Sequence, residues 1–531
     1  MNKALARGAV WVAVGLIPAA FLAVFFAWPA ATLVLRGFHD GDSWTLDGFR
    51  QVMGSRRTWR AVGFTLFSAT AATLLTLLLG LPGAYLLYRT RFPGQAALRA
   101  IVSVPFVLPT VVVGVAFASL FRALDDPLAS ILLAMAFFNY SVVVRTVGSM
   151  WARLDPRLAQ AAAALGSSPG RVFATVTLPV LAPAVASAGA LVFLFCSASY
   201  GLVMVLGRNR YTTVETEIWF HTTQLLDLPG AAALSIVQLV VVTLSLWATT
   251  ALTRRTALAL QEEAVVAFAW RRDWPSALVT GGVIVGLVGA PLAGLVQRSL
   301  TVGGPGLHNY AGLGAEGVWR ALGTSVTTAL AATAIALTLG VLVTLIASRR
   351  PARPGGRRAL GIVEAAFLLP LGVSAVTVGF GYLITLNRPP LDLRSSILLI
   401  PLAQSLVALP LVVRTLLPPL RALDVRQLEA ARALGSGSWQ VLSRIEFPHL
   451  ARGLGLAAGF ALATSLGEFG ATSFLARPDN PTLPVLIFRL TGRPGWDNHG
   501  MALAASVVLA VLTASTMAVA ERFRPRGASA L

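Results

Sequence analysis

The chain is almost without lysine, cysteine and histidine, and each shortage excludes a kind of site. Lys3 is the only lysine among 42 basic residues, so the phosphate-binding loop G-x-x-x-x-G-K-[ST], whose lysine neutralises phosphate charge, cannot be formed. Cys196 is the only cysteine, which excludes an intrachain disulfide and a cysteine cluster. The five histidines are scattered along the chain. We therefore expect no ATP site, no resident metal and no cofactor.

Charged residues are scarce as well, at 12%, whereas hydrophobic residues make up 56% and the mean hydropathy is +0.75. This polar surface is too small to cover a water-soluble body of 531 residues. Apolar runs of about 20 residues indicate membrane helices, because backbone groups in hydrocarbon must bond to one another. The sequence predicts an all-α integral membrane protein with about twelve transmembrane helices. The predicted spans are 9–35, 61–88, 98–121, 128–150, 180–206, 230–253, 276–297, 321–347, 360–386, 395–418, 449–475 and 499–520.

The net charge of +20 is spread over loops that flank these spans, which favours lipid headgroups over nucleic acid as the partner. Arginine close to span ends marks the cytoplasmic side. Arginines of this kind follow the second span of each predicted half and the last span. The loop at 36–60 argues the other way, since it carries five arginines diluted by three aspartates. We expect a multi-pass protein of the bacterial cytoplasmic (inner) membrane.

A short motif occurs twice, as QAAAALG and VTLP within 160–179 and as EAARALG and IEFP within 429–448. One constant offset in residue number, which we call the motif offset, relates the two copies. It also places Arg145 on Arg414 and Asp155 on Asp424 without a gap, which indicates a duplicated protein. Six spans in each half return the chain to its starting side, so the repeats are parallel and both motifs face one compartment. The predicted halves are 1–258, with a loop at 155–178, and 259–531, with a loop at 424–447.

Each motif copy is predicted to form two short helices joined at a glycine. Leucine and alanine recur at three- and four-residue spacing, and Gly166 or Gly435 then ends the first helix through its free access to positive φ. Small residues on one face and charges at the rim suit a groove on another protein. The alternative is an amphipathic connector that lies on the membrane surface.

The pattern E-A-A, three residues, G, nine residues, I-x-L-P resembles the signature loop of binding-protein-dependent ABC importer permeases. The second copy matches it except for Phe447 in place of leucine, whereas Gln160 and Val176 replace glutamate and isoleucine in the first. The matching or corresponding positions are Gln160, Ala161, Ala162, Gly166 and Pro179 in the first copy and Glu429, Ala430, Ala431, Gly435, Ile445 and Pro448 in the second.

This resemblance covers nearly the whole chain, which is similar to the fused two-half permeases of thiamine and ferric-iron importers. It implies that each loop is a coupling helix seated on one copy of a separate, homodimeric ATPase. It also implies that an extracytoplasmic binding protein delivers the solute. The chain itself is then a pore subunit and not an enzyme.

Glu468 is the most conspicuous ionisable residue at membrane depth, where a charge costs about 2.5–3.5 kcal/mol on insertion scales. It lies between glycines in the predicted eleventh span, and its repeat equivalent is Ser199. Tyr200 matches Phe469 in the same way. Glycines here favour a broken helix that lines a cavity, so we predict that these four residues line the translocation path of a cationic solute. The alternative is a glutamate that hydrogen-bonds to neighbouring backbone.

Two questions stay open at the level of the sequence. The segment at 195–219 looks more like thiamine importers than iron importers, so the predicted solute is thiamine or a related cation, with ferric iron as the alternative. A secondary transporter of the major-facilitator type would also have two parallel six-span halves, but its signature loops follow the second span of each half.

The acidic residues Glu215, Glu217, Asp479 and Asp497 are predicted to lie in outside loops.

Overall fold

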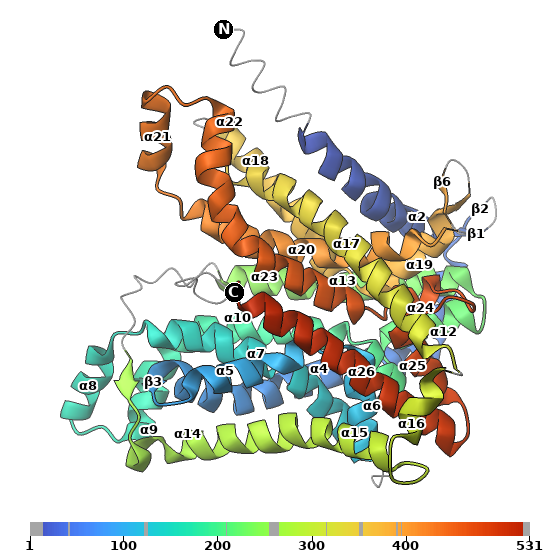
Figure 1. The fold of residues 1–531 in the computed structure, drawn as a ribbon, viewed down its shortest axis with the longest axis horizontal. Helices are drawn as coiled ribbons and strands as arrows, with labels where there is room; N and C mark the ends of the chain where they lie inside the picture. The colour runs from blue at the N-terminus through green and yellow to red at the C-terminus, as the bar shows by residue number, and fades with distance from the viewer. Residues whose placement is uncertain are drawn as a thin grey trace.

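The structure is a computed structural model that describes residues 14–40, 43–121, 126–208, 210–253, 265–314, 316–349, 354–388, 391–393 and 396–523. Helices dominate it (Figure 1). The predicted boundary between residues 258 and 259 and the single lysine, Lys3, lie outside the described residues.

The first half begins with a helix over Val14–Gly37, whose last part is α2 (Trp28–Gly37). Next in order are α3 (Asp47–Gly54), α4 (Arg56–Ala84) with a π-helical turn at Tyr85–Arg89, α5 (Gln95–Ser103) with a 3-10 turn at Val104–Phe106, α6 (Thr110–Leu120) and α7 (Leu128–Ala152). The half continues with α8 (Pro156–Ala164), α9 (Pro169–Val172), a π-helical turn at Phe173–Thr177, α10 (Leu178–Ser197), α11 (Gly201–Leu206), α12 (Val214–Thr223) and α13 (Leu228–Thr253).

The second half repeats this order. It contains α14 (Trp270–Gly282), a π-helical segment at Val283–Gly289, α15 (Ala290–Thr301), α16 (His308–Ala311), a 3-10 turn at Gly312–Gly314, α17 (Val318–Ala347), α18 (Pro354–Leu368) with a 3-10 turn at Leu369–Gly372, and α19 (Ala375–Thr385). It ends with α20 (Leu399–Arg421), α21 (Val425–Ala433), α22 (Ser438–Val441), a π-helical turn at Leu442–Glu446, α23 (Phe447–Leu466), α24 (Thr472–Leu475), α25 (Leu483–Gly492) and α26 (Trp496–Glu521).

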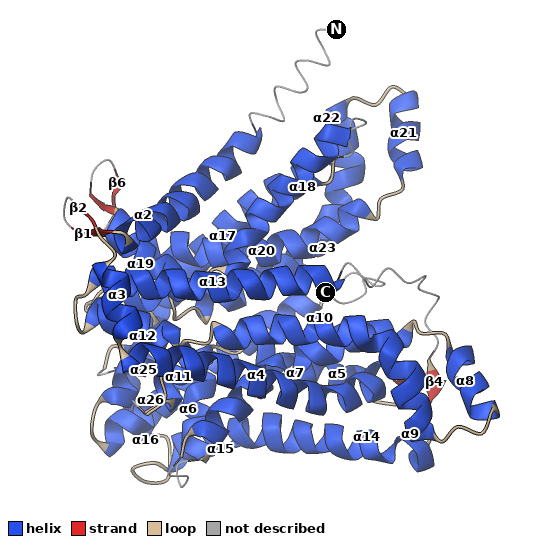
Figure 2. Cartoon of the chain, turned by 180° about the vertical axis from the view of Figure 1, so that it is seen from behind, coloured by secondary structure: helices blue, strands red, loops and turns tan. Residues whose placement is uncertain are grey.

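In the part of the chain that the structure describes, three pairs of two-residue strands lie between the helices (Figure 2). Strands β1 (His39–Asp40) and β2 (Ser43–Trp44) pair antiparallel, as do β5 (Asn387–Arg388) and β6 (Leu391–Asp392). Strand β3 (Thr90–Arg91) pairs in parallel with β4 (Val266–Ala267), with Thr90 opposite Val266. This last pair attaches the start of the second half to the end of the second span.

The described residues include nine helices that are long and apolar enough to cross a membrane, which confirms the all-α membrane fold. The predicted third span is instead the pair α5 and α6, bent by 99°. The predicted ninth and eleventh spans, 360–386 and 449–475, are each divided into two helices. Pro105 and Pro109 lie at the bend of the third span, where a missing N–H interrupts the helical ladder. Hydropathy does not register such breaks. The glycines of the eleventh span predicted its break, whereas the breaks in the third and ninth spans were not predicted.

The helices form two bundles that join at one end and diverge towards the other (Figure 1). Each bundle takes its first long helix from the other half of the chain. Phe25, in the first helix, packs against Tyr382 of α19 with ring centroids 6.2 Å apart. Conversely, Val283, Leu287 and Val288, in the seventh predicted span, belong to the apolar core around α4 and α7.

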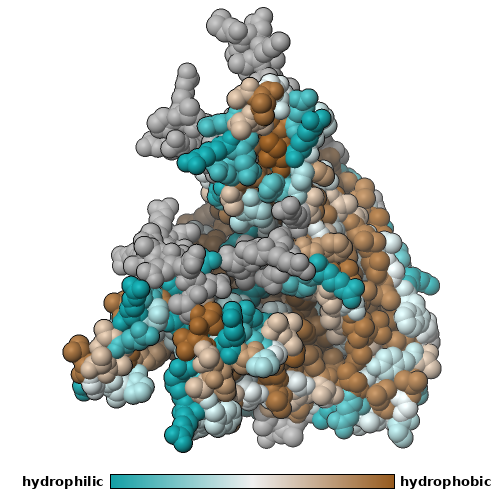
Figure 3. All heavy atoms as spheres, turned by 60° about the vertical axis from the view of Figure 1, so that its left-hand side comes forward, coloured by the Kyte–Doolittle hydropathy of each residue, from teal (hydrophilic) through white to brown (hydrophobic). Residues whose placement is uncertain are grey.

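The joined end has an apolar core drawn from α6, α12 and α13 of the first half and α19, α25 and α26 of the second. At the diverging end the cores are separate, and α8 and α21 both project there (Figure 1). Broad hydrophobic patches cover the flank of the molecule, while hydrophilic residues gather towards its projecting parts (Figure 3). This is the distribution expected when the flank faces lipid and the ends face water.

Candidate coupling loops and central cavity

The two motif copies adopt the same structure residue by residue. The motif offset carries α8 onto α21, the short helix α9 onto α22, one π-helical turn onto the other and the start of α10 onto that of α23. The side chains of Asp155 and Asp424 accept the backbone N–H of Arg157 and Arg426, each at 2.9 Å, and so cap the first helix. The predicted pair of short helices joined at a glycine is therefore confirmed in both halves.

Gly166 and Gly435 end these helices with φ values of +81° and +82°. In the first copy the N–H of Ser167 donates to the carbonyl of Ala162, and in the second Ser436 donates to Ala431. This backward bond is a helix-ending motif that needs a left-handed residue, which glycine adopts without a Cβ penalty. The sequence identified both positions and the reason for them.

The predicted contact residues of the loops lie on the surface. Gln160, Ala161, Glu429 and Ala430 are exposed, and Ala162 and Ala431 are half-buried. The glycines and Pro179 and Pro448 are exposed as well. The most exposed apolar side chains are Leu165 and Leu434, repeat equivalents at the helix ends with 88% and 87% of their surface free.

An arginine that the sequence did not single out anchors the base of each loop. Arg89 is buried and donates to the carbonyls of Trp151 and Leu154 at 3.2 and 2.8 Å, just before α8. Arg349 donates through both Nη atoms to the carboxylate of Glu446, at 2.8 and 2.9 Å, just before α23. The separation of these two arginines along the chain is shorter than the motif offset, so a search at that offset does not pair them.

A second pair of contacts shows the same separation, which is shorter than the motif offset. Thr65 in α4 and Ser325 in α17 have the same separation along the chain as the two arginines. They accept the N–H groups of Val214 and Leu483 at 3.0 and 2.7 Å. These hydroxyls hold the starts of α12 and α25, which are themselves related by the motif offset. The offset thus differs between elements, because the connecting loops differ in length.

The four predicted path residues come together in one central cavity. It has a volume of about 360 Å³, and its lining includes Ser199, Tyr200, Glu468 and Phe469, with residues from both halves around them. The helices of the fifth and eleventh spans break here, since α10 ends at Ser197 and α23 at Leu466. The predicted break at the glycines is confirmed.

Close packing explains the glycines at this break. A Cβ on Gly201 would collide with Thr110 at the start of α6, and one on Gly470 with Ala375 at the start of α19. Helices α6 and α19 are repeat equivalents that start at these two residues, so both halves make the same approach. Only glycine, which has no Cβ, leaves room for this close approach between the helices.

The rings of Tyr200 and Phe469 stack on each other, with centroids 5.2 Å apart and an interplanar angle of 20°. Both residues are buried, and Tyr200 also donates to Ser473 at 3.2 Å. Both residues line the cavity and also belong to the apolar core of the joined end, so the stacked rings lie where the cavity meets that core.

Glu468 lines the cavity and is also bonded to its own backbone. Its Oε1 accepts the N–H of Ala471 at 2.7 Å and its Oε2 that of Thr472 at 3.0 Å. The carboxylate thereby caps α24, where the helix N-terminus favours negative charge. Glu468 therefore lines the cavity and bonds to neighbouring backbone at once, because two accepted bonds leave the carboxylate further lone pairs.

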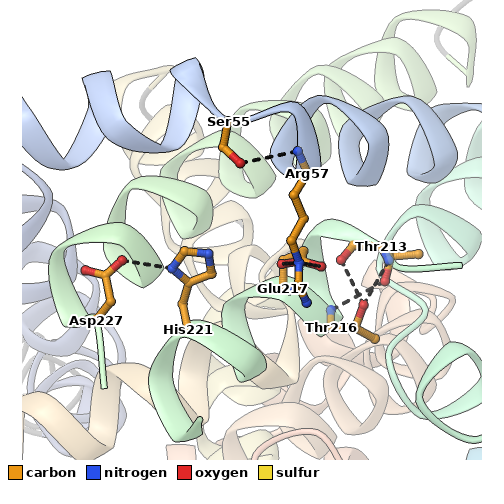
Figure 4. A network of polar contacts seen from close by, with 7 residues as sticks. All are labelled: Ser55, Arg57, Thr213, Thr216, Glu217, His221 and Asp227. Atoms are coloured by element: carbon orange, nitrogen blue, oxygen red, sulfur yellow. Dashed lines mark hydrogen bonds and ion pairs between the residues drawn. The ribbon is translucent and has the colours of Figure 1, made fainter. Parts of the chain in front are cut away.

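Two acids predicted in outside loops are buried in α12. Glu217 binds the Nε atom of Arg57 at 2.9 Å, and His221 of the same helix contacts Asp227 at 2.9 Å (Figure 4). Glu215 is buried where the halves meet and accepts the hydroxyl of Ser374, the residue that caps α19. Burial raises the pKa of Glu215 to about 8. Asp479 lies exposed in a loop, as predicted, whereas Asp497 is exposed in the first turn of α26.

Comparison with known proteins shows similarity over most of the chain. The family of binding-protein-dependent transport system inner membrane components matches it twice, over residues 72–258 and 336–528, which is more than half of its length. The chain belongs to this family. It is a multi-pass inner-membrane permease built from two copies of the family domain, and the secondary-transporter alternative is thereby excluded.

The permease is similar to the thiamine transport system permease protein ThiP of Brucella abortus (strain 2308), with 28% identity over 492 residues, or 87% of each chain. ThiP of Escherichia coli (strain K12) is 27% identical over 457 residues, covering 82% of this permease and 84% of that protein. The sulfate transport system permease protein CysT of the same organism is 34% identical over 201 residues, but these cover only 35% of this permease and 73% of CysT.

Proposed function

We propose that this permease moves thiamine or a related cation into the cytoplasm, powered by a separate homodimeric ATPase that docks on α8 and α21. A binding protein delivers the solute from the other side. The observation that carries the coupling role is the pair of repeat-equivalent loops projecting at the same end, each with a leucine almost fully free at its tip.

The docking role rests on the unusual exposure of Leu165 and Leu434. Full burial of a leucine contributes about 1.5–3 kcal/mol, so two such side chains at matching positions favour a partner with two matching grooves. The rims differ, because Glu429 stands where the first copy has Gln160. We expect the second loop to make the charge-assisted contact.

This docking role is tested by the ATPase activity of the assembled importer. Leu434→Ser should weaken assembly and lower solute-stimulated ATP hydrolysis by about tenfold or more, since about 1.4 kcal/mol of lost contact is tenfold. Leu226→Ser, a change at an exposed leucine outside both loops, is the matched control. Unchanged assembly and hydrolysis in Leu434→Ser would remove the docking role.

The transport role rests on the central cavity. Glu468 supplies a carboxylate to a lining that otherwise consists of apolar and hydroxyl-bearing groups with Asn139. Such a lining suits an organic cation with an aromatic ring, which Tyr200 and Phe469 can face. The stacked rings hold the cavity closed on the side of the binding protein, so delivery of solute requires them to separate.

Thiamine is favoured over ferric iron by the relatives and by the lining. The similar proteins that cover most of the permease are thiamine permeases by name. Ferric iron prefers several oxygen ligands, whereas the cavity lining contains one carboxylate. The choice is tested by uptake into vesicles that contain the permease, its ATPase and its binding protein. Uptake of labelled thiamine, unaffected by ferric chelates, supports the proposal, and uptake of iron in its place contradicts it.

A further inference from the structure

Each half has a cavity at the end where the bundles diverge, and the two cavities are repeat equivalents. The first, of about 690 Å³, lies beside α5 and α7, and the second, of about 530 Å³, lies beside α18 and α20. Six lining positions correspond, two through the offset that relates α6 to α19 and four through the motif offset. In the first cavity these are Arg99, Ser103, Arg145, Ser149, Ala152 and Arg153, and in the second Glu364, Leu368, Arg414, Pro418, Arg421 and Ala422.

The two cavities differ in charge. In the second, Glu364 binds Arg421 through both oxygens, so the pair neutralises itself. In the first, arginine replaces this glutamate at position 99, and the lining contains three arginines against one carboxylate, Glu521. Ser103 and Ser149 add hydroxyl groups where the second cavity has leucine and proline.

Two of these guanidinium groups have donors to spare. Arg99 lies over the ring of Tyr88, 4.3 Å from its centroid, and its Nε donates to the carbonyl of Leu87. Its Nη atoms, and the whole guanidinium of Arg153, have no hydrogen-bond or ion-pair partner in the part of the chain that the structure describes. Guanidinium donors in such a fork match the oxygens of a phosphate group.

The rest of the lining is apolar and comes from both halves. Val104 and Phe106 belong to the third span, and Phe460 and Met517 to α23 and α26. We propose that this cavity binds the phosphate group of an amphipathic anion, with the phosphate between Arg99 and Arg153 and the apolar part along these side chains. The ligand is an anionic phospholipid or a soluble phosphate ester, which share this chemistry.

The proposal is tested by binding to the purified full-length permease in detergent. Native mass spectrometry would count retained phosphatidylglycerol and phosphatidylcholine, and calorimetry would measure phenyl phosphate and inorganic phosphate. We expect phosphatidylglycerol, phenyl phosphate or both to bind in preference to phosphatidylcholine. Retention of phosphatidylglycerol alone assigns the site to lipid, and binding of phenyl phosphate alone assigns it to a soluble ester.

Variants locate the site. Arg99→Glu gives position 99 the residue type that the second cavity has there and should weaken binding at least about tenfold, as should Arg153→Gln, because each removes a charge-assisted contact. Arg414→Gln, in the equivalent second cavity, should leave binding within about twofold. If Arg99→Glu is not monodisperse, Arg99→Gln replaces it. Equal retention of both lipids with no phosphate binding, or unchanged binding in the variants of both arginines, would overturn the proposal.

Discussion

At the scale of single residues, Glu468 combines a place in the lining of the central cavity with hydrogen bonds to its own backbone. Glu468 was recognised in the sequence because a charge in an apolar run needs a reason. Its bonds to Ala471 and Thr472 could not be foreseen, since they depend on where α23 ends. Glu215 and Glu217 were misplaced, because hydropathy does not distinguish a short buried helix from a solvated loop.

Glu468→Gln should raise the KM for a cationic solute about tenfold, since it removes a charge while its amide oxygen still accepts one backbone N–H. The measurement is initial uptake rate against solute concentration in proteoliposomes. Ser199→Ala, at the repeat-equivalent position, controls for loss of a polar group without loss of charge. An unchanged KM in Glu468→Gln would leave the residue with its capping role alone.

Glu215 should make stability fall as pH rises. Burial raises the pKa of its carboxyl from 4.5 to about 8, whereas the Ser374 hydroxyl and the Gln238 side chain that face it act in the opposite direction. Between these two values the unfolded chain has lost the proton that the folded chain retains, so unfolding becomes more favourable as pH increases. Melting temperature measured across this window should decline in the wild type and less so in Glu215→Gln. Parallel curves for the two proteins would contradict this.

At the scale of elements, the two repeated loops show which local structures a repeat in the sequence can predict. The capping aspartates, the helices and the positive φ at Gly166 and Gly435 all follow from local chemistry that the sequence displays. The arginine anchors do not, because they depend on where the end of the second span of each half meets the loop. No local pattern marks the π-helical turns before α10 and α23 either.

Gly435→Val should lower solute-stimulated ATP hydrolysis by about tenfold, because a β-branched residue at positive φ costs about 1–2 kcal/mol and moves the helix end. Gly166→Val should strain the chain equally but affect hydrolysis less, since the proposed charge-assisted contact is made by Glu429 and the first copy has Gln160 at that position. Gly170→Ala is the control, with open space around its Cα and no positive φ. Normal stimulation in Gly435→Val would argue against coupling through α21.

Arg349→Gln should destabilise the permease by about 3 kcal/mol, because it leaves the buried carboxylate of Glu446 without its charge partner. Arg421→Gln, which breaks the more exposed pair with Glu364, should cost about 0–1 kcal/mol. Thermal unfolding followed by circular dichroism measures both. Combining Arg349→Gln with Glu446→Gln should recover part of the loss, and equal effects of the two single variants would show that burial does not set the cost.

At the scale of the whole molecule, the duplication, the parallel repeats and the membrane fold were predictable, since they depend on period and hydropathy. The exchange of the first and seventh predicted spans between the bundles was not predictable, because no local pattern specifies which bundle a span joins. The exchange ties the halves together at one end while α8 and α21 stand apart at the other (Figure 1). In the proposed mechanism, closing of the ATPase dimer brings these two helices together.

The most direct measurement is uptake by the permease reconstituted with its ATPase and binding protein, with ATP and an ion gradient supplied separately. We expect ATP alone to drive accumulation of the solute, and Gly435→Val to reduce it although the protein inserts normally. Accumulation driven by an ion gradient in the absence of ATP, or equal uptake by Gly435→Val, would contradict the proposal that α8 and α21 deliver the work of an ATPase to the central cavity.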